Sequence, residues 1–167
     1  MEEELILPKW VWAFPVLIIL LALGYLYSPR ERDGRPILLL PDVRAVETYR
    51  LAIVRWRGQA QRLDMQISTI LSGRFGEDLF TRSRESQKMI DEAVRLLQDI
   101  EQHKVPTAAV PARSISIAMA NAYLEAARAT LLWTTAPNEA NLAQAQKQLQ
   151  KARRILEELE ASEWTLK

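Results

Sequence analysis

The chain has 167 residues, a formal net charge of +1 and no cysteine. The lack of cysteine excludes disulfide bonds, thiolate metal sites and cysteine nucleophiles. The near-neutral charge gives no general electrostatic argument for nucleic acid or for strongly acidic partners.

An uncharged apolar segment, WVWAFPVLIILLALGYLY, covers residues 10–27 and follows a short tail at residues 1–9. As a helix it would be about 27 Å long, close to the thickness of the hydrocarbon core of a bilayer. Aromatic residues that favour the headgroup region lie at its two ends: Trp10, Trp12, Tyr25 and Tyr27. The segment therefore predicts one transmembrane helix, with these four residues as interface anchors and the lipid bilayer as a partner.

Two other interpretations of this segment stay open. It would be a cleaved signal peptide if Ala22-Leu23-Gly24 were a cleavage site, but the start, Met1-Glu2-Glu3-Glu4, is acidic where signal peptides are basic. It would be a buried helix of a soluble domain if Pro15 marked a break in the segment. Membrane helices tolerate such a proline more readily than soluble ones, which favours the transmembrane interpretation.

Flanking basic residues predict the orientation of this helix. Only Lys9 precedes it, whereas Arg30, Arg32 and Arg35 follow it. Cytoplasmic flanks carry the excess of lysine and arginine, so we expect the tail outside and the remainder of the chain in the cytoplasm. An extracytoplasmic domain is the alternative.

The remainder of the chain is expected to be one helical domain behind a linker. Residues 28–41 are rich in proline and arginine, which disfavours a continuous helix from the membrane. Residues 42–167 suffice for one domain with one core. Apolar residues recur there in steps of three and four, the pattern of amphipathic helices. The expected helices cover about residues 43–72, 77–103, 113–134 and 138–161.

Apolar stripes of these four helices are expected to share one core. Its expected members are Ile53, Trp56, Leu63, Ile90, Leu97, Trp133, Leu149 and Leu156. Helices with apolar stripes must cover one another, and an antiparallel four-helix bundle is the simplest arrangement. Two stacked helical hairpins are the alternative. The predicted fold is thus all-α, with a transmembrane helix followed by a bundle.

The third helix of the domain carries a second apolar row besides the stripe centred on Met119 and Ala126. This row lies roughly 150° around the helix, at 3.6 residues per turn. It consists of Ile117, Ala120, Leu124, Ala127 and Leu131. Because apolar faces are usually covered, we interpret the row as a candidate interface for another subunit or for self-association. Alternatively, the neighbouring helices wrap this helix more fully than usual.

The first helix of the domain is locally basic. Arg44, Arg55 and Arg62 align opposite its apolar stripe and are candidate contacts for an anionic surface such as acidic lipid. A solvated helix face is the plainer interpretation. No aromatic side chains are interleaved for base stacking, since Tyr49 and Trp56 belong to the apolar stripe, so nucleic acid is not an expected partner.

No pattern in the sequence predicts a catalytic, cofactor or metal site. His103 is the only histidine, and its position near the end of the second helix suits an interaction with the last backbone carbonyls. The glycines of SGRFG at residues 72–76 lack the lysine and the spacing of a phosphate-binding loop. We therefore expect no cofactor and no enzymatic activity.

These patterns favour a non-catalytic, membrane-anchored helical subunit or adaptor of a larger membrane assembly. The alternative is an extracytoplasmic sensor or ligand-binding domain on a single-pass anchor, because a bundle can hold a small ligand between its helices.

Overall fold

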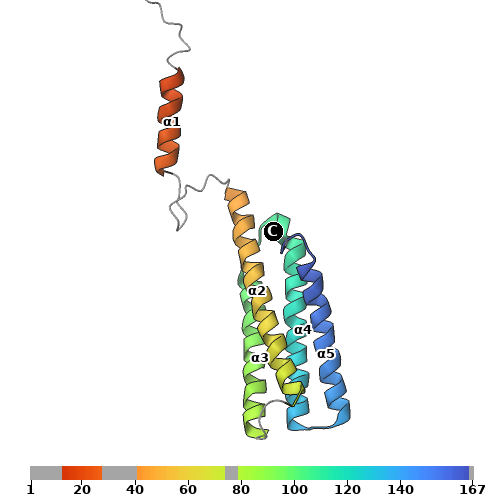
Figure 1. Ribbon diagram of the computed structural model, residues 1–167. Coiled ribbons are helices and arrows are strands. Elements are labelled where there is room, and N and C mark those ends of the chain that lie inside the picture. Colours follow the sequence, from red (N-terminus) through yellow and green to blue (C-terminus); the bar gives the residue numbers. More distant parts are fainter. Residues whose placement is uncertain (1–12, 28–40, 74–78, 166–167) are drawn as a thin grey trace, which may run out of the picture. The chain divides into compact units, whose positions relative to one another are not determined.

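Helices form every regular element that the computed structural model describes, which covers residues 13–27, 41–73 and 79–165 (Figure 1). The chain divides into two compact units, residues 1–41 and 42–167, and each is described by itself. The all-α class expected from the sequence is confirmed.

The first unit contains α1 (Ala13–Tyr27), a helix of 15 residues without a charged side chain. Its large apolar side chains from Phe14 to Leu23 are 43–66% exposed. The described helix is about 22 Å long at 1.5 Å per residue. Among the described residues, no helix is both long enough and apolar enough to cross a membrane.

Two of the four expected interface anchors, Trp10 and Trp12, lie outside the described residues. The other two, Tyr25 and Tyr27, belong to the last turn of α1. Residues 28–40 of the expected linker also lie outside the described ranges.

The second unit holds four long helices and a short 3-10 helix that leads into the third of them. They are α2 (Pro41–Leu71), α3 (Leu79–Gln102), η2 (Thr107–Ala109), α4 (Val110–Thr135) and α5 (Glu139–Glu160). Each end of a long helix lies within three residues of the end expected from the sequence. Local chemistry accounts for two of these ends. The side chain of Asn138 accepts from the Asn141 amide at 2.8 Å and caps α5. Gly73, with φ of 70°, adopts the left-handed conformation that follows α2.

Successive long helices run in opposite directions (Figure 1). Between α3 and α4, Ser86 lies beside Thr134, whereas Arg113 donates to the carbonyl of Glu101, so residue numbers rise in one helix as they fall in the other. Side-chain contacts between α2 and α5 join the first long helix to the last. These contacts close a bundle, which two stacked hairpins would not do, so the helical bundle is confirmed.

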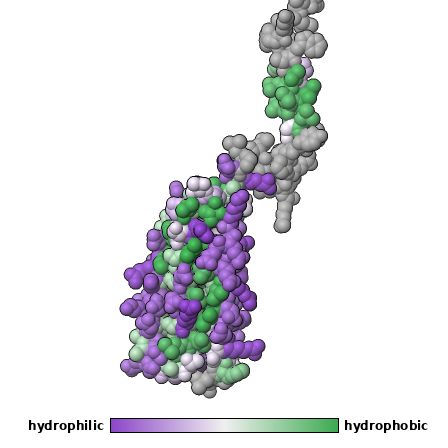
Figure 2. Space-filling view, turned by 180° about the vertical axis from the view of Figure 1, so that it is seen from behind, coloured by the Kyte–Doolittle hydropathy of each residue, from purple (hydrophilic) through white to green (hydrophobic). Residues whose placement is uncertain are grey.

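One hydrophobic core runs through the bundle, and all eight residues expected to share it contribute. Ile53 and Trp56 are completely buried, whereas Ile90, Leu97 and Trp133 are half-buried at its margin. Figure 2 shows hydrophilic side chains over much of one face, with an apolar band running lengthwise between them. Apolar side chains therefore reach the surface along part of this face.

Trp56 offers a test of the core. Replacing it with alanine is expected to cost about 3–5 kcal/mol in the free energy of unfolding, because the indole is fully buried. Chemical denaturation of the full chain in detergent measures this loss. Trp133→Ala is the matched control and should cost less, since Trp133 is only half-buried. Equal losses for both variants would contradict the arrangement of the core.

Candidate functional site: the groove between α2 and α5

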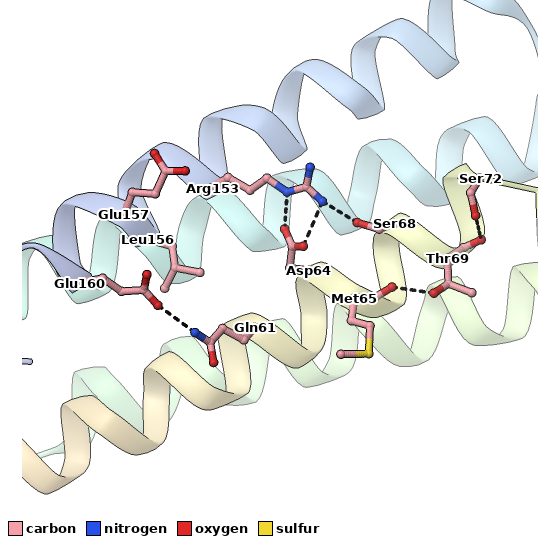
Figure 3. Close-up of a pocket in the computed structure, with 10 residues that line it drawn as sticks. All are labelled: Gln61, Asp64, Met65, Ser68, Thr69, Ser72, Arg153, Leu156, Glu157 and Glu160. Carbon is pink, nitrogen blue, oxygen red and sulfur yellow. Dashed lines mark hydrogen bonds and ion pairs between the residues drawn. The ribbon is translucent and has the colours of Figure 1, made fainter.

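A groove of about 660 Å³ lies between α2 and α5 (Figure 3). Its lining is mostly polar and comes from these two helices: Gln61, Asp64, Met65, Ser68, Thr69, Ser72, Arg153, Leu156, Glu157 and Glu160. The groove is open to solvent and joins two helices that lie far apart in the sequence. It is therefore the main candidate for a catalytic or binding site.

Arg153 of α5 binds two residues of α2 inside this groove. Its Nε and Nη2 donate to the two carboxylate oxygens of Asp64 at 2.7 and 3.0 Å, and Nη2 also donates to Ser68 Oγ at 2.7 Å (Figure 3). Asp64 and Ser68 are one helical turn apart, so they face the same residue of α5. The planar guanidinium makes two parallel hydrogen bonds to the carboxylate. This geometry fixes the relative orientation of the two groups more strictly than a single hydrogen bond does.

Tyr123 brings α4 into the same network. This tyrosine is completely buried, and its hydroxyl donates to Asp64 Oδ1 at 3.4 Å. Burial, together with the negative charge of Asp64, raises the pKa of the Tyr123 phenol far above its ordinary value of 10. The hydrogen bond to Asp64 likewise raises the pKa of Arg153. The phenol therefore stays neutral and the guanidinium stays charged, so neither group is poised to transfer a proton near neutral pH.

The same network leaves no nucleophile paired with a base. Ser68 accepts from a guanidinium, which cannot take its proton, and the groove lining contains no histidine. In the part of the chain that the structure describes, no group of three or more His, Cys, Asp or Glu side chains could hold a metal ion. Chemically, Asp64, Ser68, Tyr123 and Arg153 form a polar clasp that ties α5 and α4 to α2.

A second groove, of about 430 Å³, lies between α2 and α3. Its charged residues are balanced, with two cations and two anions: Arg62, Arg95, Glu92 and Asp99. The side-chain oxygens of Gln59 and Gln66, which also line it, are buried and have no hydrogen-bond partner among the described atoms. Such oxygens would accept from water or from a polar ligand, but the balanced charges select neither sign of ligand charge.

His103 contributes to an aromatic cluster near the start of α2. Its ring centroid lies 5.4 Å from that of Trp56 and 5.8 Å from that of Tyr49. Close by, Asp99 accepts from Trp56 Nε1 and from Arg55 Nη2, each at 2.8 Å. The sequence indicated only a role at the helix end. The spacing of four between Asp99 and His103, which lies just after the end of α3, would place both on one face of the expected helix, but no local signal pairs that face with α2.

The second apolar row of α4 lies inside the bundle. Ala120, Leu124 and Ala127 are at most 6% exposed, and Ile117 and Leu131 are half-buried. Arg113 lies one turn before Ile117 on the same edge and donates to α3, so this edge faces α3. Ala120, Leu124 and Ala127 are therefore covered within the chain itself and are not available as an external protein interface. The alternative, that neighbouring helices cover α4 on two sides, is correct because small alanines let them approach closely.

The three arginines expected to face an anionic surface are all exposed on α2. Arg55 is also bound to Asp99, with its side chain 55% exposed, and Arg62 lies beside the groove between α2 and α3. Arg44 lies near the start of the helix. They thus share one side of α2 but do not converge on one point.

Comparison with protein-family models, curated proteins and solved structures finds no match.

The buried tyrosines predict how stability depends on pH. Burial raises the pKa of Tyr49 and of Tyr123 in the folded chain above 10. Above pH 10 the unfolded chain therefore releases protons that the folded chain keeps, so stability falls as pH rises. The slope is up to about 1.4 kcal/mol per pH unit for each tyrosine. Tyr123→Phe should flatten this fall in urea unfolding experiments, and an unchanged slope would contradict the burial of the phenol.

The clasp predicts a coupling between Asp64 and Arg153. A double-mutant cycle with Asp64→Asn and Arg153→Gln should give about 1 kcal/mol, a modest value because Arg153 is 45% exposed and screened by solvent. Urea unfolding of the four proteins measures it. The control cycle uses Glu125 and Arg128, a pair on one exposed helix face, where we expect about 0.3 kcal/mol. Equal couplings would argue against the clasp.

Proposed function

We propose that this protein is a non-catalytic, membrane-anchored helical subunit or adaptor of a larger membrane assembly. The observation that carries the proposal is α1, whose 15 residues are uncharged and whose large apolar side chains from Phe14 to Leu23 are exposed. In the sequence the uncharged stretch extends from Trp10 to Tyr27, which approaches the length of a membrane helix. Lipid would cover these side chains, while the helix pairs the backbone groups of its interior within itself.

The polar groups of the bundle support a non-catalytic role. In the groove between α2 and α5, the charges of Asp64 and Arg153 satisfy each other and the Tyr123 phenol is held neutral. Catalytic groups need a proton or an electron pair that is free to react. A closed, internally paired bundle on a membrane helix is suited to binding another subunit. The excess of arginine after residue 27 supports a cytoplasmic bundle.

The anchor is tested by a charge placed in α1. Ile19→Arg should move the full chain from the carbonate-resistant membrane fraction to the soluble fraction, because a charge at the centre of a membrane helix costs about 2.5–3.5 kcal/mol. Ile19→Leu is the control and should stay with the membrane. Retention of Ile19→Arg in the membrane fraction would refute α1 as the anchor, and a soluble unaltered chain would refute membrane anchoring altogether. Since the chain has no cysteine, Ala45→Cys also supplies a single exposed thiol near the start of α2.

That thiol reports the orientation. An impermeant maleimide should label it only after cell lysis, and labelling in intact cells would favour the extracytoplasmic sensor instead. The adaptor role itself predicts that affinity capture after mild detergent extraction recovers other subunits in a fixed ratio to this chain. Recovery of the chain alone, still bound to the membrane before extraction, would contradict the adaptor role.

A further inference from the structure

The outer face of α2 carries an apolar row that the bundle does not use. The row consists of Leu51, Val54, Gly58 and Met65, which we call the α2 outer row. Leu51 is 71% exposed, Met65 69% and Val54 43%. Leu51, Gly58 and Met65 are spaced by seven residues, so they lie on nearly one line along the helix. Apolar side chains aligned in this way resemble one side of a helix–helix contact that lacks its second helix.

Gly58, at the centre of the row, has no neighbour among the described residues that would require a glycine. A Cβ atom added to it would meet nothing within 4 Å, so no neighbouring element of the chain needs the space. Glycine in the middle of a helix lowers helix stability compared with alanine. What glycine provides is room for another backbone to approach closely. A flat lipid surface makes few additional contacts at a single glycine. A crossing helix, in contrast, can bring its backbone into direct contact with the backbone of α2 there.

Arginines flank the α2 outer row. Arg55 and Arg62 follow Leu51 and Gly58 by four residues each, which places both arginines on the same neighbouring edge. On the opposite side, Arg50 pairs with Glu47 at 3.4 Å. Arg55 also pairs with Asp99 of α3 at 2.8 Å, so Arg62, which has no ion pair among the described residues, carries most of the charge of this edge.

These charges argue against a second copy of the chain on this face. In an antiparallel pair of α2 helices that crosses at Gly58, like edges meet, so Arg55 would face Arg62 of the copy. In a parallel pair, the edge of Arg62 would meet the edge of Arg57 and Arg50. Both arrangements oppose like charges, which is unfavourable. A helix with acidic residues beside its apolar stripe would meet opposite charges.

We propose that the α2 outer row docks an amphipathic helix of a partner subunit, which places apolar side chains over Gly58 and carboxylates beside Arg55 and Arg62. This inference rests on the adaptor role proposed above and names the surface that performs it. The contact would be a helix-to-helix interface in which the apolar row supplies affinity and the arginine edge supplies specificity.

The test uses two synthetic amphipathic helices as probes. Both have about 20 residues, a length at which helices become stable, with leucine at the contact positions. One carries glutamate and the other lysine at the flanking positions. Fluorescence anisotropy measures their binding to the full chain in detergent. We expect the glutamate peptide to bind at least about tenfold more tightly than the lysine peptide, because only it complements the arginine edge.

Two variants locate the binding. Gly58→Leu should weaken binding of the glutamate peptide at least about tenfold by filling the crossing point, while the melting temperature stays the same or rises because the space is open. Gln150→Leu, on an exposed position of α5, is its control. Arg62→Glu should reverse the preference between the peptides, whereas Arg154→Glu, also exposed on α5, should not.

Four outcomes would overturn the inference. Equal binding of both peptides, or binding that Gly58→Leu leaves unchanged, would show that the α2 outer row is not the docking surface. A change of oligomeric state in Gly58→Leu, without peptide binding, would assign the face to a second copy. A fluorophore on Leu51→Cys that responds to anionic-lipid nanodiscs but not to the peptide would assign it to the membrane. In each case, membrane retention and stoichiometric capture of other subunits would still report on the adaptor role separately.

Discussion

The covering of α4 is the constraint on which the rest of the bundle depends. Eleven of its residues are buried, distributed around most of the helix, so a single neighbour cannot cover them. α3 packs on one side and α5 on the other, and Tyr123 reaches Asp64 of α2. The buried hydroxyls of Ser116 and Thr130 each donate to the carbonyl four residues earlier at 2.8 Å. At these two positions the hydrogen bond therefore compensates the free-energy cost of burying the hydroxyl group.

Polar contacts then fix which helices are neighbours. Apolar stripes attract one another without much directional preference, so they allow several arrangements of four helices. Arg153 with Asp64 and Ser68 joins α5 to α2, whereas Asp99 with Trp56 and Arg55 joins α3 to α2. Each contact needs its donor and acceptor at fixed positions along two neighbouring helices. A shift of one helix by one residue would break the contact. We regard these contacts as the source of specificity, while burial supplies most of the stability.

Because the polar groups of the clasp are already paired, the outer surfaces of the bundle are the better candidates for binding. The paired charges in the groove between α2 and α5 already stabilise the fold, which makes them poor candidates for catalysis. Two sets of apolar side chains are exposed: those of α1 from Phe14 to Leu23 and those of the α2 outer row. The first suits lipid because it is uncharged throughout, and the second suits a helix because it contains Gly58 and borders arginines.

The sequence by itself determined the helices, since spacings of three and four residues reflect the helical repeat and depend on no distant partner. It also determined which stripe of each helix faces the core, as Ile53, Trp56 and Leu149 illustrate. It left open what covers the row from Ile117 to Leu131, because burial by a neighbouring helix and burial by another protein select the same apolar residues. It gave no sign of the contact between Asp64 and Arg153, which are 89 residues apart. Only the tertiary structure decided these points, because contacts between helices depend on their relative positions, and those positions result from the packing of all four helices at once.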